Sequence, residues 1–396
     1  MMKIDEPNIK HNPSFALFAL GFRPFFFLAA FFAPVLIVLW LMQLLGHITL
    51  SSYYSPTAWH AHEMLFGYTV AVIAGFLLTA AGNWTGMRVV NGWRLVLLVL
   101  VFLLSRLAPF MTELSHGIIA TLDLIFIPLV TIFLATPIIK AKQWSNFIFI
   151  PLLLLMATAN AAVHLSALSI IDISIVSGSR AMLYLVILLI VIMGGRVIPF
   201  FTERGVQGVT TKKWQWIEWG AGFSVILVML ADVVLENTIL TAYFAIFAGI
   251  VHGLRLAGWY SNKIWQAPLV WILQLAYGWI VLGFIIKSAV LFNPAASMFA
   301  YHAFTVGGIG IMTLGMMARV SLGHTGRNMQ INHWMVISFV LINIAAVVRV
   351  IVPMLLPEFY LPLINVAGGL WVGAFILFLV VYTPMWFYSR VDGREG

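Results

Sequence analysis

The stretch NFIFIPLLLLMATANAAVHLSAL, residues 146–168, contains no Asp, Glu, Lys or Arg. A helix rises about 1.5 Å per residue, and about 20 apolar residues cross the hydrocarbon core of a bilayer. The stretch is long enough for such a crossing, and its second half carries an amide and an imidazole side chain, Asn160 and His164. It therefore predicts a transmembrane helix that brings a histidine into the membrane.

Segments of the same kind run along the whole chain and are joined by short connections. The twelve predicted transmembrane helices are residues 15–46, 57–81, 92–108, 115–138, 146–168, 178–201, 215–236, 237–258, 266–292, 296–321, 332–354 and 359–389. We therefore predict an all-α polytopic membrane protein. Its single transmembrane domain, residues 15–389, is expected to lie between an N-terminal tail, 1–14, and a C-terminal tail, 390–396.

The composition excludes several classes of protein. Hydrophobic residues make up 62% of the 396 residues and charged residues 9%, whereas soluble domains carry roughly 25% charged residues. A soluble globule, a disordered chain and a nucleic-acid-binding domain are therefore excluded. The chain contains no cysteine, which excludes disulfides, thiolate metal sites, iron–sulfur clusters and cysteine nucleophiles. Any metal ion must be held by His, Met or oxygen ligands.

The basic residues predict the orientation, because the cytoplasmic loops of membrane proteins are enriched in Lys and Arg. If the N-terminus is cytoplasmic, all but four of the 21 Lys and Arg residues fall on the cytoplasmic side. The exceptions are Arg106, Arg180, Lys287 and Arg349. Because the number of helices is even, both termini are then predicted to be cytoplasmic.

Weak internal similarity suggests a threefold repeat. Pro24, Pro151 and Pro268 begin the first, fifth and ninth predicted helices. Charged residues hold matching places in the third, seventh and eleventh helices, namely Arg106, Asp232 and Arg349. The pattern predicts three four-helix units of about 120 residues each, with chance similarity among apolar helices as the alternative.

The histidines are the most informative residues, because ionisable side chains inside a membrane are costly and by default indicate function. Ten histidines occur in the chain, and several fall in the outer halves of four predicted helices. These are His60, His62, His116, His164 and His302. Imidazoles that meet at one depth from several helices are the arrangement that a haem or copper site needs. The alternative is that each imidazole hydrogen-bonds to a neighbouring helix.

The run WHAHEM, residues 59–64, places two histidines close together. Residues two apart on a helix point about 200° away from each other, so His60 and His62 are predicted to serve two centres on opposite faces. Glu63 falls on the face of His60. There it could orient the imidazole, take up protons, or stabilise the start of the helix as an N-terminal acid.

Two arginines, Arg106 and Arg349, lie on the side that is depleted in basic residues. They are predicted either to bind haem propionates or to form ion pairs with Asp123 or Asp232, and snorkelling to the interface is a third interpretation. Asp123 falls in the middle of the fourth helix, where a carboxyl group is protonated or paired. It is therefore either a residue of a proton route or the partner of Arg106.

The tenth predicted helix is rich in glycine, with Gly307, Gly308, Gly310 and Gly315. Small residues permit close approach of helices, and they also leave room for a flat macrocycle. Close helix packing is the interpretation that we favour.

Several motifs resemble, in the same order, those of the NnrS family. They are GFRPFF (21–26), WHAHEMLFG (59–67), RVIPFFT (196–202), HAFTVG (302–307) and RVSLGHTGR (319–327), with Asn160 and His164 in the fifth helix and His252 in the eighth. The resemblance covers nearly the whole chain. It implies a haem- and copper-containing protein of the bacterial inner membrane, associated with denitrification and with resistance to nitric oxide stress. The helix number and the outer histidines also resemble haem–copper oxidase and nitric oxide reductase architecture, a likeness at the level of the fold.

On these grounds we interpret the chain as a membrane haem–copper enzyme that removes nitric oxide by reducing it to nitrous oxide. His60 and His302 are the predicted axial ligands of a haem b. His62 and His164, with His116, are predicted to hold the second centre, a haem or copper. The further candidate metal ligands are His252 and His324.

The remaining predicted roles concern charge and partners. Arg106 and Arg349 are expected to meet the haem propionates, and Glu63 or Asp123 to pass protons. The predicted partners are nitric oxide, membrane lipid and an external electron donor such as a quinol or a cytochrome, and no nucleic acid. Two other functions fit the same residues: a non-enzymatic haem protein that binds or senses nitric oxide, and a cofactor-free transporter.

Overall fold

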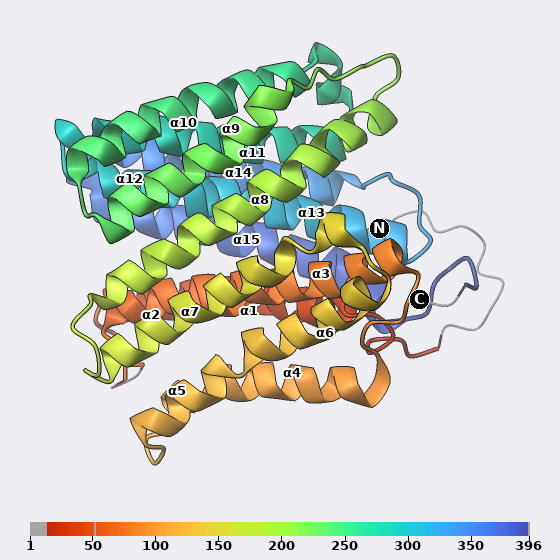
Figure 1. Cartoon of the computed structure of the whole chain (residues 1–396), viewed down its shortest axis with the longest axis horizontal. Helices are drawn as coiled ribbons and strands as arrows, with labels where there is room; N and C mark the ends of the chain where they lie inside the picture. The colour runs from red at the N-terminus through yellow and green to blue at the C-terminus, as the bar shows by residue number, and fades with distance from the viewer. Residues whose placement is uncertain (1–13, 51–52, 395–396) are drawn as a thin grey trace. The chain divides into compact units, whose positions relative to one another are not determined.

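The structure is a computed structural model that describes residues 14–50 and 53–394 (Figure 1). In this described part, twelve helical segments are long and apolar enough to cross a membrane, which confirms the predicted all-helical architecture of twelve spans. The spans are Phe22–Leu44, Pro56–Thr85, Gly92–Phe110, His116–Lys140, Trp144–Ala167, Ile175–Gly205, Gln215–Val234, Thr238–Trp259, Pro268–Leu291, Ala296–His324, His333–Leu355 and Pro357–Phe387. The threefold repeat stays a prediction.

Several spans contain more than one helix. The α-helices of the described residues are α1 (Phe22–Leu44), α2 (Pro56–His62), α3 (Val70–Thr85), α4 (Gly92–Leu107), α5 (His116–Leu124), α6 (Phe126–Lys140), α7 (Phe149–Ala167), α8 (Ile175–Gly205), α9 (Gln215–Met229), α10 (Thr238–Trp259), α11 (Pro268–Ser288), α12 (Ala296–His302), α13 (Ile311–His324), α14 (His333–Leu355) and α15 (Tyr360–Phe387). The interruptions between them have local causes.

The fourth span is divided into α5 and α6 by a proline. Pro128 lacks the N–H group that would bond to the carbonyl oxygen of Leu124, and α5 ends at this residue. Asp123 therefore lies at the end of a helix inside the span, where its side chain can turn toward neighbouring helices. At the other end of α5, the side chain of Ser115 accepts a hydrogen bond from the N–H of Ile118 and caps the helix.

Three spans contain a π-helical segment, and two of these segments directly follow a histidine. η1 (Glu63–Thr69) comes after His62, η7 (Ala303–Gly310) comes after His302, and η4 (Leu230–Val234) contains Asp232. Such wide turns are rare and often occur at functional sites. The sequence pattern did not predict these π-helical segments.

The chain forms two compact units. The first comprises Met1–Met182, Met317–Met329 and Phe375–Gly396, and the second comprises Leu183–Met316 and Gln330–Ala374. In the first unit, α3 packs against α1 and α6, and α6 packs against α7. In the second unit, α10 packs against both α9 and α11.

The described ends of the chain lie together in the first unit. The N–H of Ser389 donates to the carbonyl oxygen of Ser14 at 2.9 Å, and the N–H of Ala16 donates to that of Phe387 at 2.8 Å. Arg23 is fully buried and donates to carbonyl oxygens at the end of α15. An even number of spans requires both ends to lie on the same side of the membrane. The assignment of that side to the cytoplasm stays a prediction.

The glycines of the tenth span are packing residues, as predicted. A Cβ atom on Gly307 would lie 2.5 Å from the ring of Trp279, and one on Gly310 would lie 2.5 Å from the ring of Trp371. All four residues belong to the second unit. The indole rings therefore occupy the space beside these glycines, which from the sequence alone could also have held a macrocycle.

Candidate metal centre

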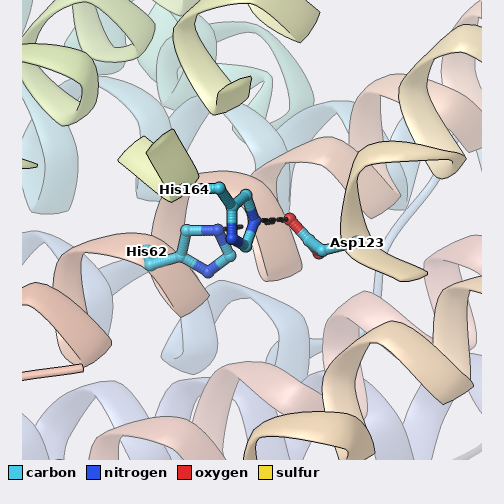
Figure 2. Close-up of side chains that lie close together, drawn as sticks. All are labelled: His62, Asp123 and His164. Atoms are coloured by element: carbon cyan, nitrogen blue, oxygen red, sulfur yellow. Dashed lines mark hydrogen bonds and ion pairs between the residues drawn. The ribbon is translucent and has the colours of Figure 1, made fainter. Parts of the chain in front are cut away.

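Three spans of the first unit bring two imidazoles and one carboxylate together. His62 ends α2, Asp123 lies near the end of α5, and His164 lies in the last turns of α7 (Figure 2). All three side chains are buried, and one ligand atom from each lies within 4.8 Å of the others. Among the described residues, this is the one group of three or more His, Asp or Glu side chains that could hold a metal ion.

Both imidazoles direct the same ring nitrogen at the same carboxylate oxygen. Nε2 of His164 lies 2.9 Å from Oδ2 of Asp123, and Nε2 of His62 lies 3.3 Å from it. The two rings have their centres 5.3 Å apart and are nearly perpendicular, at 76°. Two nitrogens and one oxygen thus converge on a small volume from three different helices.

The other nitrogen of each imidazole is also engaged. Nδ1 of His62 lies 3.2 Å from Oε1 of Glu63, and Nδ1 of His164 lies 2.8 Å from the hydroxyl of Tyr53. Metal-binding histidines in proteins show this arrangement, in which a carboxylate or another oxygen takes the second ring N–H and fixes the ring orientation. Both rings are therefore held with Nε2 directed at Asp123, which makes Nε2 the ligand atom of each ring.

Asn160 organises the same three groups. Its amide nitrogen donates to Oδ2 of Asp123 at 2.7 Å, and its amide oxygen lies 3.2 Å from Nε2 of His62. The residue is one turn before His164 on α7, so both side chains leave the same helix face. A single helix face thus supplies one ligand and the side chain that positions the others.

The charges of the site leave an excess of one negative charge. Arg106 from α4 donates to Oε1 of Glu63 at 3.0 Å and forms an ion pair with Asp123. These three side chains are only 2–4% exposed. One guanidinium faces two carboxylates, so with neutral imidazoles the cluster favours an added cation. Of the alternatives for Arg106, the structure shows the ion pair with Asp123.

A glycine allows Arg106 and Glu63 to form their ion pair. A Cβ atom on Gly67 would lie 3.1 Å from Oε2 of Glu63 and 3.3 Å from Nη1 of Arg106. Gly67 belongs to η1, the π-helical segment that starts at Glu63. The π-helical turn and the lack of a side chain at Gly67 together allow the guanidinium of Arg106 to reach Glu63 in the second span.

Aromatic residues shield the centre from water. The His62 ring stacks between those of Tyr54 and Phe66, with centres 4.9 and 4.8 Å away. Burial raises the pKa of the Tyr53 hydroxyl to about 12 and that of Tyr54 well above its usual value. Both tyrosines therefore act as neutral hydroxyl groups beside His164.

The donor set indicates the class of metal. Two imidazole nitrogens and a carboxylate oxygen suit divalent transition metals such as iron, copper or zinc, and they do not suit Mg²⁺ or Ca²⁺, which prefer oxygen ligands. His62, Asp123 and His164 therefore fit a copper(II) or non-haem iron(II) ion. Such three-ligand sites leave positions open for a small molecule.

Three predicted ligands of the first unit, His60, His116 and His324, lie outside this group. The ring of His60 stacks on that of Trp40, with centres 4.5 Å apart and an angle of 14°. His116 is exposed, and its ring packs against that of Tyr53 at 5.1 Å. His60 and His62 thus occupy different surroundings, as residues two apart on a helix should.

The second unit contains two further candidates. Nδ1 of His302 lies 2.8 Å from the carbonyl oxygen of Met298, and its Nε2 lies 2.9 Å from Nη2 of Arg349. His252 is fully buried; its Nδ1 lies 2.6 Å from the hydroxyl of Tyr277, and its ring stacks on Phe284. The pairing of His60 with His302 across one haem stays a prediction.

His324, in the first unit, packs its ring against Phe22 and lies 3.4 Å from the amide nitrogen of Asn83. These contacts involve neither of the carboxylates at the centre. A ligand role for His324 stays a prediction.

Sequence reasoning missed part of the surroundings of the centre. Glu63 was expected on the face of His60, but it contacts His62, because the helix changes to a π-helical segment at this residue. Tyr53 and Tyr54 precede the second span and look in the sequence like ordinary interfacial aromatics. The only sequence signal for their role is their position just before a span with two histidines.

The residues of the candidate metal centre all lie in the part of the sequence that matches a known protein family. The sequence profile of the family described as NnrS protein matches residues 16–390. No curated protein matches the chain. The matched range includes every residue of the buried His–Asp–His group and of its surroundings.

Proposed function

The chain belongs to the NnrS family, and on this premise we propose that it is a membrane haem–copper protein that reduces nitric oxide to nitrous oxide. The family is linked to nitric oxide stress. The observation that carries the proposal is the buried group of His62, Asp123 and His164, whose ligand atoms lie within 4.8 Å of one another. Ionisable side chains inside a membrane are costly and by default indicate function.

His62, Asp123 and His164 would hold a copper or iron ion through two nitrogens and one oxygen. Such an ion supplies an open position for nitric oxide and a change of oxidation state. The protein contributes orientation, because Glu63 and Tyr53 hold the second nitrogens of the two imidazoles. It also excludes water, because all of these side chains are buried.

The reaction needs protons as well as electrons. Two molecules of nitric oxide, two electrons and two protons give one nitrous oxide and one water, so one N–O bond breaks and one N–N bond forms. Glu63 is the proposed proton carrier, because its carboxylate contacts both His62 and Arg106. Asp123 is the proposed alternative, and the electrons come from an external quinol or cytochrome.

The haem part of the proposal concerns His60 and His302 as axial ligands and Arg349 as the partner of a propionate. The partly exposed imidazole of His60 and the guanidinium of Arg349, which has no carboxylate partner among the described residues, support these roles. The chemistry of a haem there would be one-electron transfer. His252, whose Nδ1 lies 2.6 Å from the hydroxyl of Tyr277, and His324, which lies 3.4 Å from the amide nitrogen of Asn83, remain further proposed ligands.

The test uses the full-length protein, purified in detergent and supplied with a chemical reductant under anaerobic conditions. Haem and metal content are measured first, then the loss of nitric oxide and the formation of nitrous oxide. We expect catalytic turnover in the wild-type protein and loss of both metal and turnover in the variant His62→Ala/His164→Ala. The matched control is His47→Ala, which changes an exposed histidine outside the spans.

Two outcomes would replace the enzymatic proposal. Metal-dependent uptake of nitric oxide that stops at a stoichiometric amount, without nitrous oxide, would favour a protein that binds or senses the gas. A preparation that holds neither haem nor metal after expression in metal-replete medium would favour a transporter.

A further inference from the structure

Arg349 in α14 is a cation of the second unit whose partners are all uncharged. Its Nη2 lies 2.9 Å from Nε2 of His302 and 3.4 Å from the hydroxyl of Tyr360. Its guanidinium lies over the Tyr360 ring, 5.5 Å from the ring centre. Its Nη1 is buried and has no hydrogen-bond partner. None of the carboxylates in the described residues forms an ion pair with it.

Three other cations of these spans are neutralised by carboxylates, whereas Arg23 is fully buried and donates to backbone carbonyl oxygens at the end of α15. Arg106 pairs with Glu63 and Asp123, Arg255 with Glu218, and Lys287 with Asp232. Removing a charge from water without a counter-charge is costly, and a buried charge is therefore normally paired. Arg349 is partly buried, and its partners among the described residues include neither a carboxylate nor a backbone carbonyl. This indicates that its counter-charge is supplied by a ligand from outside the chain.

The hydrogen bond between Arg349 and His302 has only one possible direction. A guanidinium has no acceptor, so it donates and Nε2 of His302 accepts. Nδ1 of the same ring then carries the proton and donates to the carbonyl oxygen of Met298 at 2.8 Å. The lone pair of Nε2 is thus occupied, and this nitrogen cannot ligate a metal while Arg349 remains in place.

We propose that Arg349 and Tyr360 form a receptor for an oxyanion group of a ligand, and that its arrival withdraws Arg349 and frees Nε2 of His302. The oxyanion is a carboxylate or a phosphate, the groups that guanidinium recognises with two parallel hydrogen bonds. The coordination step rests on the proposed haem-binding function. A bare metal cation is repelled by the guanidinium, whereas a metal held in an anionic macrocycle brings the counter-charge with it.

The comparison with the first unit supports this assignment. His62 and His302 both directly precede a π-helical segment, and Gly67 and Gly307 stand at the same distance after them. The local backbone is thus alike, but the neighbouring charges are opposite. His62 faces carboxylates, which attract a cation, and His302 faces Arg349, which attracts an anion.

The experiment uses the full-length protein in nanodiscs of zwitterionic phosphatidylcholine. The readout is the rate at which diethylpyrocarbonate modifies His302, measured by mass spectrometry of the peptide, because the reagent attacks an imidazole nitrogen with a free lone pair. In Arg349→Gln we expect a rate about tenfold above wild type, the effect of losing one charge-assisted hydrogen bond. The matched control is Arg394→Gln, whose parent side chain is 82% exposed and whose rate should equal that of wild type.

Three additions to the wild-type protein identify the source of the oxyanion. If the oxyanion is a haem carboxylate, addition of haem b gives a Soret shift and protects His302 from modification. The dimethyl ester of haem b should then bind the wild-type protein at least about tenfold more weakly than haem b. This difference in affinity should disappear in Arg349→Gln. If it is a lipid phosphate, phosphatidylglycerol raises the modification rate of wild type to that of Arg349→Gln. Equal rates in wild type and Arg349→Gln overturn the proposal, as does a wild-type rate that neither haem nor phosphatidylglycerol changes. Failure of haem uptake alone contradicts the haem part of the proposed function. The phosphatidylglycerol experiment then decides whether Arg349 and Tyr360 bind an oxyanion.

Discussion

Nδ1 of His164 lies 2.8 Å from the hydroxyl oxygen of Tyr53. With this nitrogen engaged, the ring can offer only Nε2 to Asp123, which lies 2.9 Å away. The hydrogen bond therefore decides which atom of the imidazole is a ligand, although Tyr53 itself lies outside the group that would hold the metal. Such partners of a ligand contribute much of the affinity of metal sites.

Replacement of Tyr53 by phenylalanine should weaken metal binding without removing it. The ring of His164 would keep its place in the packing but lose the hydrogen bond that fixes its orientation, and such losses lower metal affinity roughly 10–100-fold. Competitive titration of the purified protein with a chelator of known affinity measures the change. Tyr388→Phe, at a half-exposed position, is the control. Equal affinity in wild type and Tyr53→Phe would contradict the positioning role.

The ionisation of Tyr53 should be shifted to alkaline pH. Burial raises its pKa to about 12, so the folded protein favours the neutral hydroxyl and the unfolded chain ionises first. The resulting stabilisation is complete below about pH 10, the usual tyrosine value, and is lost as the pH rises toward 12. The tyrosinate absorbance of wild type minus that of Tyr53→Phe gives the titration curve of this residue. A midpoint at the usual value would show that the hydroxyl is not shielded.

Substitution of Asp123 by asparagine should affect both metal binding and stability. The variant keeps the shape of the side chain but leaves Arg106 with Glu63 as its only carboxylate partner among the described residues. Breaking a buried ion pair costs roughly 3–5 kcal/mol. Because Arg106 keeps its pair with Glu63, the loss of unfolding free energy should lie near the lower end of this range. Metal analysis and denaturant unfolding in detergent measure the two effects.

Asp392→Asn is the matched control for that substitution. Its carboxylate also pairs with an arginine, at 2.6 Å, but it is 30% exposed and lies beyond the last span. An exposed pair contributes about 0–1 kcal/mol, so its loss should be small and metal content should not change. Similar losses in the two variants would mean that the Arg106–Asp123 pair is not buried as described.

The twelve spans could be predicted from the sequence because hydropathy depends on local composition. The packing interpretation of the glycine-rich tenth span also held, since small residues in apolar helices usually serve close contacts. The buried centre was harder. Residues 62, 123 and 164 come from three spans, and their meeting depends on tertiary packing that no local pattern contains.

Two local irregularities explain the largest differences at the centre. The π-helical segment that starts at Glu63 turns this carboxylate to His62 and not to His60. The break before Pro128 ends α5 next to Asp123. The proline was visible in the sequence, but which neighbour the freed carboxylate meets depends on α2 and α7.

Removal of the metal should destabilise the folded protein. A ligand that binds only the folded state adds about 2.7 kcal/mol when its concentration is one hundred times its dissociation constant. A membrane-permeable chelator should therefore lower the unfolding temperature of wild type and restore it on addition of copper(II) or iron(II). The double variant His62→Ala/His164→Ala should show neither effect. A chelator effect of equal size in that variant would place the metal elsewhere in the chain.

Alanine at Gly307 should destabilise the second unit, whereas alanine at Gly369 should not. The new Cβ at Gly307 would lie 2.5 Å from the ring of Trp279, which is itself packed between helices, while nothing lies within 4 Å of a Cβ at Gly369. Overpacking of this kind costs roughly 1–3 kcal/mol, and a helical glycine without neighbours gains up to about 1 kcal/mol on change to alanine. Unfolding in detergent should therefore move in opposite directions for the two variants. A tolerated Gly307→Ala would mean that the indole ring can move aside, and the space beside the tenth span would again be open to a flat ligand.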